Sequence, residues 1–260
     1  MKIPYYHVDV FSGNLFEGNP AGVCLLPDGW LPDETLQSIA AENNLSETAF
    51  VVQEGGTFKL RWFTPTVEMD LCGHATVAPA HVLFNELQFG AHEISFETAS
   101  GPVSVARDKG LLVLDFPSRP AVECPSPEDA EKVLSRAPQA CLKSRDYLFV
   151  FKDESEVRSL SPDFQSMEKW DTLGVIVTAP GDTIDFVSRF FAPGAGVNED
   201  PVTGSAHCTL IPYWAERLGK DRLDARQVSA RGGQLSCRQA GERVKIGGTA
   251  VTYLQGELTL

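Results

Sequence analysis

The sequence predicts an α+β protein built from two similar halves. Two observations carry this prediction: segments that resemble strands outnumber helical ones in each half, and each half contains one main helix. The chain has 260 residues, of which 43% are apolar, and this is enough for one large hydrophobic core or two medium ones. An internal repeat favours two hydrophobic cores.

The repeat is visible as two copies of one motif. Phe58-x-x-Arg61-x-Phe63-x-Pro65 recurs 128 residues later as Phe186-x-x-Arg189-x-Phe191-x-Pro193. After three additional residues in the second copy, a constant offset of 131 residues relates pairs that include Glu68 and Glu199, Gly73 and Gly204, Leu87 and Leu218, and Arg107 and Arg238. We interpret this register as two homologous domains, residues 1–117 and 118–260, packed as a pseudo-dimer. Two similar strand-loop-helix units that share only turn chemistry are the alternative.

Hydrophobic periodicity assigns the elements of the first half. Strands are expected at residues 3–11, 21–26, 48–53, 57–63, 92–97, 103–107 and 111–116. A helix is expected over residues 32–43, where Leu36, Ile39 and Ala40 share one face. The main helix runs from about His74 to Leu87. Four prolines mark the linker to the second half: Pro117, Pro120, Pro125 and Pro127.

The second half repeats this order. Strands are expected at residues 147–151, 173–177 and 184–191, followed by a loop, a helix from about Ser205 to Leu218 and strands to the end. Pro79 and Pro212 fall inside the two main helices. Because proline cannot donate a helical hydrogen bond, we expect each helix to be kinked or to have its first turns tight or buried against the sheet.

Composition excludes several classes of protein. The formal net charge of −13 disfavours nucleic acid and anionic membranes as partners, because both require a basic face. It is compatible with a small anionic ligand held by local dipoles. No apolar run reaches the roughly 20 residues of a membrane helix, and the N-terminus does not resemble a signal peptide, so we expect a cytoplasmic protein. The six cysteines form no Cys-x-x-Cys pair and are expected to be free thiols.

Two matched loops are the candidate site. Residues 64–76 and 192–207 lead into the main helices through Gly73-His74 and Gly204-Ser205. A helix N-terminus exposes backbone N–H groups, and glycine permits close approach of a ligand. Two such junctions facing each other would bind a carboxylate or enolate between the domains. Ordinary helix capping is the alternative.

The two loops carry different residues at a position where an enzyme with a single base would need a difference. Cys72 corresponds to Thr203, which argues against a racemase with one thiolate on each side of the substrate carbon. Glu47, at the start of an apolar strand, is the candidate base, since partial burial of a carboxylate favours its protonated form and suits a proton shuttle. A solvated glutamate at a strand end is the alternative. His74 and Asp200 lie in the matched loops and could bind the substrate or tune Glu47.

Other motifs are weaker or absent. The cysteines and histidines near these loops lack zinc-ligand spacing, so no metal is expected. Asn14 and Asn19 are expected to form turns. The sequence contains no nucleotide-binding glycine motif and no Gly-x-Ser-x-Gly.

Four motifs, in this order, resemble the PhzF-like (phenazine-biosynthesis-like) family, relatives of diaminopimelate epimerase. They are Val8-Asp-Val-Phe11 with Gly18-Asn-Pro-Ala-Gly-Val23, Asn44-Leu-Ser-Glu-Thr-Ala-Phe50, Leu71-Cys-Gly-His-Ala-Thr76 and Glu199-Asp-Pro-Val-Thr-Gly-Ser-Ala206. The resemblance covers essentially the whole chain. It implies two diaminopimelate-epimerase-like domains, each a curled, mostly antiparallel sheet around a central helix. Strand 249–260 would cross back to complete the first sheet.

The same resemblance implies an isomerase without a cofactor. Glu47 would move a proton between two carbons of a small carboxylate-bearing metabolite, with His74 and Asp200 as further catalytic residues. Gly73, His74, Gly204 and Ser205 would hold the substrate between the domains, and the family suggests a homodimer. Two alternatives stay open: a non-catalytic member that binds a small acid or a protein, and an epimerase that uses Glu47 and Cys72 as unlike bases.

Overall fold

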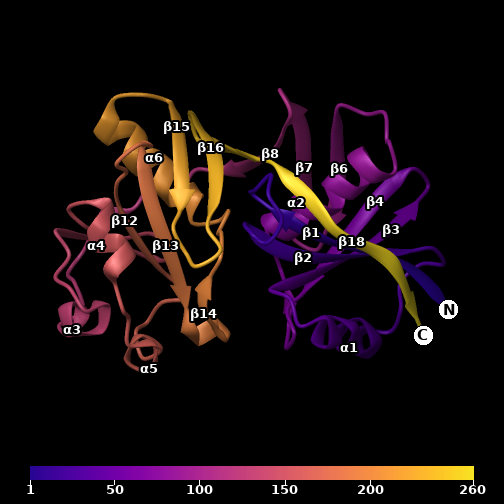
Figure 1. The fold of residues 1–260 in the computed structure, drawn as a ribbon, viewed down its shortest axis with the longest axis horizontal. Coiled ribbons are helices and arrows are strands. Elements are labelled where there is room, and N and C mark those ends of the chain that lie inside the picture. The colour runs from indigo at the N-terminus through magenta and orange to yellow at the C-terminus, as the bar shows by residue number, and fades with distance from the viewer. The chain divides into compact units, whose positions relative to one another are not determined.

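Strands make up most of the fold, and they are distributed over two compact units. The computed structural model describes all of residues 1–260. The first unit comprises Met1–Asp115 and Gly247–Leu260, and the second comprises Phe116–Ile246 (Figure 1). The C-terminal segment therefore returns to the unit in which the chain begins.

The first unit contains nine strands and two α-helices. The strands are β1 (Lys2–Val10), β2 (Asn19–Leu26), β3 (Glu47–Glu54), β4 (Thr57–Phe63), β5 (Glu68–Met69), β6 (Glu93–Thr98), β7 (Gly101–Asp108), β8 (Leu111–Pro117) and β18 (Ala250–Thr259). The helices are α1 (Asp33–Asn43) and α2 (His74–His81), and α2 continues as a π-helix over Val82–Glu86.

The second unit contains the remaining strands and four α-helices. Its strands are β9 (Val122–Glu123), β10 (Ala140–Lys143), β11 (Tyr147–Val150), β12 (Val175–Pro180), β13 (Phe186–Ala192), β14 (Val197–Asp200), β15 (Arg222–Gln227), β16 (Gly233–Ala240) and β17 (Arg243–Gly248). Its helices are α3 (Ala130–Leu134), α4 (Glu154–Ser159), α5 (Phe164–Met167) and α6 (His207–Leu218), with a 3-10 turn at Pro193–Ala195.

The two units share one strand topology. In the first, the order β18-β1-β2-β3-β4-β6-β7-β8 is antiparallel except at the parallel pairs β2–β3 and β4–β6. In the second, the order β10-β11-β12-β13-β15-β16 has its parallel pairs at the corresponding places, β11–β12 and β13–β15. The repeat in the sequence is thus matched by a repeat in the strand order.

Each unit is organised around its main helix. All eight residues of α2 are buried, and the helix packs against β1, β2 and β3. Its small residues, mainly alanine, permit this close packing. The predicted face of α1, formed by Leu36, Ile39 and Ala40, packs into a separate core with strand residues that include Ile3, Phe50 and Phe63. Strands β2 and β3 are therefore covered on both sides.

Both main helices contain a proline, and both replace its missing hydrogen bond in the same way. Pro79 cannot donate to the carbonyl of Ala75, which instead accepts from Trp62 Nε1 at 3.2 Å. Pro212 cannot donate to the carbonyl of Cys208, which instead accepts from the backbone N–H of Arg119 at 2.9 Å. A buried carbonyl without a partner would destabilise the helix. Burial of these turns, one of the two predicted outcomes, is therefore accompanied by a substitute donor.

Several predicted boundaries are wrong. The first main helix does not continue as an α-helix to Leu87, because it widens into a π-helix after His81. The second begins at His207 and not at Ser205, since residues 204–206 form a turn before it. Helices α3, α4 and α5 were not predicted. They span four to six residues, which is too short for a 3.6-residue period to be recognised. No helix is long and apolar enough to cross a membrane.

We predict that Trp62→Phe lowers the free energy of unfolding by about 1–3 kcal/mol through the orphaned Ala75 carbonyl. In a Pro79→Ala background, residue 79 regains a backbone N–H that can donate to the same carbonyl. The effect of Trp62→Phe should therefore be smaller there, and urea denaturation of the four proteins measures the difference. Equal effects in the two backgrounds would contradict the assigned hydrogen bond.

Candidate active site

Three polar side chains meet where strands β2 and β3 begin. Asn19 is the first residue of β2, Glu47 is the first residue of β3, and these two strands run parallel. Their starting ends therefore lie at the same edge of the sheet. The N-terminal residue of α2, His74, packs at this edge and brings its imidazole to both side chains.

The imidazole of His74 is the centre of the cluster. Its Nε2 lies 3.0 Å from Glu47 Oε2, and the two side chains are 5% and 15% exposed. On the other side of the ring, Nδ1 lies 3.2 Å from Asn19 Nδ2 and 3.6 Å from Cys72 Sγ. One buried ring thus connects the candidate base to an amide and a thiol.

Burial and charge determine the ionisation of this cluster. Burial, followed by the nearby Glu47 carboxylate, raises the pKa of Cys72, so its thiol is protonated at neutral pH. Burial lowers the pKa of His74, but the contacts of its ring with Cys72 and Glu47 outweigh burial and raise that pKa well above its usual range. The amide of Asn19 can face Nδ1 with its donor or its acceptor, and so accommodates either state of the ring.

Glu47 Oε2 and His74 Nε2 have no partner besides each other. Both atoms are buried, and neither makes a hydrogen bond beyond their 3.0 Å contact. Buried polar atoms with so few partners are uncommon in folded proteins, and a catalytic role is one of their recognised explanations.

The same residues also group potential metal ligands. Ligand atoms of Glu47, Cys72 and His74 lie within 4.8 Å of one another. Glu47 faces Nε2 of the imidazole, whereas Cys72 faces Nδ1. Because one ring nitrogen can bind an ion, the residue that faces the other nitrogen would have to shift to complete the set of three ligands.

The loop of the second unit is held by a different polar network. The carboxylate of Asp200 accepts a hydrogen bond from Thr203 Oγ1, and its carbonyl accepts from Gln227 Nε2 at 2.7 Å. The side chain of Gln227 is fully buried and also accepts from the Thr203 N–H at 2.8 Å. Gly204 is buried and Ser205 is half-buried. The loop that contains three predicted site residues is therefore fixed within its own unit.

An identical ion pair anchors both loops. Arg61 makes a bidentate contact with Glu68 at 2.6 and 2.7 Å, and Arg189 makes one with Glu199 at 2.7 and 2.9 Å. Each guanidinium also lies over a phenylalanine, Phe63 or Phe191, at 5.1 or 4.9 Å. The residues involved are the ones matched by the sequence repeat.

A second matched contact closes each loop at its helix. Thr76 Oγ1 donates to the carbonyl of Cys72, and His207 Nδ1 donates to the carbonyl of Thr203 at 2.8 Å. Thr76 corresponds to His207 at the offset of 131 residues, as Cys72 does to Thr203. The two loop-to-helix junctions thus have the same local architecture despite different side chains.

The structure distributes the predicted site residues over the two units. Glu47, Gly73 and His74 come together in the first unit, whereas Asp200, Gly204 and Ser205 lie in one loop of the second. Their roles stay predictions. The turn prediction for Asn19 is wrong, because its side chain is fully buried and contacts His74. Its place in the Gly18-to-Val23 motif was the signal that could have identified it.

The comparisons with known proteins agree with this fold. The profile of the phenazine biosynthesis-like (PhzC-PhzF) protein family matches residues 8–256. An uncharacterized isomerase of Pseudomonas aeruginosa is 51% identical over 260 residues, with both chains fully covered. A crystal structure of a phenazine biosynthesis protein of the PhzF family from Enterococcus faecalis matches with a TM-score of 0.97 and 49% identity, again with both chains fully covered.

A more distant neighbour shows the fold alone. The hydroxyproline epimerase of Agrobacterium vitis matches with a TM-score of 0.63 at 10% identity, over 100% of this chain and 93% of the other. The predicted fold class, two diaminopimelate-epimerase-like domains, is confirmed. Its close relatives define an enzyme of the isomerase class. The chain belongs to the phenazine biosynthesis-like family.

We predict that His207 makes the protein sensitive to acid. Burial lowers the pKa of His207 to about 4, against about 6.5 for an unfolded histidine. The native state therefore takes up this proton later than the unfolded state, and stability falls as pH decreases from about 6.5 to about 4, by up to about 3 kcal/mol. The comparison is denaturant unfolding of wild type and His207→Gln at several pH values. The stability advantage of the wild type should shrink on acidification, and a constant difference would contradict the prediction.

Proposed function

We propose that the protein is a cofactor-independent isomerase in which Glu47 shifts a proton within a small carboxylate-bearing metabolite. The observation that carries this proposal is the half-buried carboxylate of Glu47 in contact with the buried imidazole of His74. A general base needs a fixed position within reach of the substrate. The contact with the packed His74 ring supplies such a fixed position.

The proposed chemistry is a two-step proton transfer. The Glu47 carboxylate removes a proton from a carbon next to a carbonyl, a carboxylate or a conjugated double bond, and the electron pair moves into the adjacent π system. The resulting carboxylic acid returns the same proton to another carbon on the same face. His74 stays beside the carboxyl group of Glu47 during these steps and keeps that group oriented. The N–H groups at the start of α2, near Gly73, are available for the developing negative charge.

The second unit is assigned a binding role that rests on the family. Asp200, Gly204 and Ser205 would contribute to holding the substrate, with His74 and Gly73 from the first unit. A small anionic metabolite is the proposed ligand, and a homodimer is the proposed assembly.

One observation favours a second reaction. Cys72 Sγ lies 3.6 Å from His74 Nδ1, and its protonated thiol could donate a proton while Glu47 accepts one. A substrate located between them would then be inverted at one carbon. This epimerase with unlike bases differs from the proton-shift isomerase in its need for Cys72 and in the stereochemistry of its product.

We predict that Glu47→Gln lowers turnover at least about 100-fold, the lower limit of general acid–base catalysis by one group. Small acids with an activated C–H bond are incubated with the protein in D2O, and NMR follows proton exchange and product formation. The matched control is Glu54→Gln, at the exposed end of the same strand. It should keep full activity and an unchanged fold.

The outcomes separate the alternatives. Loss of activity in Glu47→Gln with retention in Cys72→Ala supports the proton shift. Loss in both variants, with inversion at a stereocentre, supports the unlike-base epimerase. Binding of an acid without any C–H exchange in the wild type would support a non-catalytic member of the family. Full turnover by Glu47→Gln would overturn the mechanism.

We further predict that Ser205→Ala weakens substrate binding about 2- to 10-fold through loss of one hydrogen bond. The measurement is KM for the acid identified above, or its Kd by calorimetry. Ser126→Ala, at an exposed serine of the same unit, is the control and should behave as wild type. An unchanged KM in Ser205→Ala would remove Ser205 from the binding site.

A further inference from the structure

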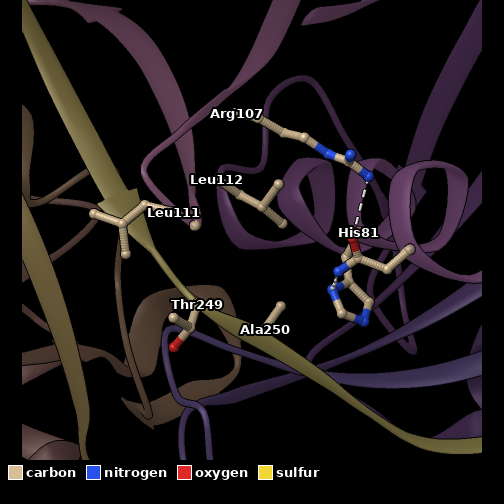
Figure 2. Close-up of a pocket in the computed structure, with 8 residues that line it drawn as sticks. His81, Arg107, Leu111, Leu112, Thr249 and Ala250 are labelled. Carbon is tan, nitrogen blue, oxygen red and sulfur yellow. Dashed lines mark hydrogen bonds between the residues drawn. The ribbon is translucent and has the colours of Figure 1, made fainter. Parts of the chain in front are cut away.

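A cavity lies in the first unit at the C-terminal end of its main helix, α2. Its volume is about 270 Å³, and its lining includes His81, Arg107, Leu111, Leu112 and Thr249 (Figure 2). His81 is the last residue of α2, whereas His74 is the first. The two histidines are seven positions apart along the helix, which corresponds to roughly 10 Å. The cavity is therefore distinct from the Glu47 cluster.

The guanidinium of Arg107 is the charged group of this cavity. It forms no ion pair, although the chain carries a net charge of −13 and the half-buried Arg61 and Arg189 each pair with a glutamate. Its one side-chain hydrogen bond goes from Nη2 to Asn85 Oδ1 at 3.2 Å, and it lies 4.2 Å from the ring centroid of Phe84. Four of its five N–H donors are thus available for an anion.

A chain of hydrogen bonds holds Arg107 in this position. Thr252 Oγ1 donates to Glu86 Oε1 at 2.7 Å and accepts from His81 Nε2 at 3.0 Å. His81 Nδ1 then accepts from Asn85 Nδ2 at 2.9 Å, so Asn85 must present its Oδ1 to Arg107. Each group has one consistent role, provided that the imidazole is neutral. Burial lowers the pKa of His81, which agrees with this requirement.

The π-helix positions the two side chains that contact Arg107. Phe84 and Asn85 belong to the π-helical turn Val82–Glu86, which closes with the bond from the Leu87 N–H to the Val82 carbonyl at 3.0 Å. A π-turn is less favourable than continued α-helix and is frequently found at functional sites. Here it directs the ring of Phe84 and the amide of Asn85 toward the same guanidinium.

Apolar side chains form part of the remaining wall, beside Thr249 and Gly110. Leu111 and Leu112 come from β8 and Ala250 from β18, and Figure 2 shows Leu112 between Leu111 and the guanidinium of Arg107. One cation beside apolar side chains matches a singly charged group better than a phosphate dianion, which would need further cationic donors. The volume is also below the roughly 300–1,000 Å³ of pockets for drug-sized ligands.

We propose that this cavity binds a small apolar monocarboxylic acid, with the carboxylate on Arg107 and the hydrocarbon part against Leu111 and Leu112. Arg107 and a carboxylate match as a bidentate pair. Asn85 is a positioning residue, since it acts through Arg107. The site is independent of Glu47 and of the proposed isomerase reaction.

The test uses benzoate and isovalerate as probes, with isothermal titration calorimetry and NMR on the full chain. Both acids should bind the wild type saturably, and their neutral amides, benzamide and isovaleramide, should bind at least about 10-fold more weakly. Arg107→Gln should lose at least about 10-fold in affinity, as expected for a charged hydrogen bond. Leu111→Trp, which fills the cavity without removing the charge, should lose binding as well.

One control variant locates the site. Arg238→Gln removes the exposed arginine that corresponds to Arg107 in the repeat. It should bind the probes like the wild type. The proposal is overturned if neither acid binds the wild type, if the amides bind equally well, or if Arg107→Gln keeps full affinity while folded.

Discussion

The bidentate arginine–glutamate pair is the constraint on which both site loops depend. Arg61 with Glu68, and Arg189 with Glu199, connect the strand before each loop to the loop itself. A single ion pair near the surface adds little to global stability. Its planar geometry with two hydrogen bonds nevertheless fixes the orientation of the two side chains. In each unit a phenylalanine ring beneath the guanidinium further restricts the arginine side chain. The loop then closes onto its helix through a side-chain bond to a carbonyl, from Thr76 or from His207.

The buried helix α2 fixes the side chains at both of its ends. Because all of its residues are buried, neither His74 nor His81 can move without displacing packed strands. Trp62 supplies the donor that Pro79 lacks, so the proline does not leave an unsatisfied carbonyl in the core. His74 is consequently presented to Glu47 with a fixed ring, which is the preorganisation that general acid–base catalysis requires. At the opposite end His81 fixes Asn85, and through it Arg107.

The sequence predicted those parts of the structure that follow from periodic or repeated patterns. The repeat matched both loops and the residues Arg61 and Arg189, which the structure shows in ion pairs. Hydrophobic periodicity indicated the strand-rich class, and the lone acid of the 44–50 motif made Glu47 the candidate base. Three features carry no comparable local signal. The contact between Asn19 and His74 joins residues 55 positions apart and depends on which strand ends share an edge. The π-helix after His81 depends on tertiary packing, which overrides helix propensity. The short helices α3 to α5 contain too few turns to show a period.

Divergence between the repeated units explains how one architecture can support one base. At the position of Cys72 the second unit has Thr203, and the backbone around the two is held by equivalent bonds. The thiol faces the imidazole of His74, whereas the threonine hydroxyl donates to Asp200. A hydroxyl is far less acidic than a thiol and cannot serve as a base at neutral pH, so the second loop has polar hydrogen-bonding capacity without a proton acceptor at that position. With Cys72 itself protonated through burial, the carboxylate of Glu47 is the group of the cluster that can accept a proton from carbon. The proposed proton shift by one base agrees with this chemistry, whereas inversion by two equivalent thiols would need a second thiol at position 203, where the chain has a threonine.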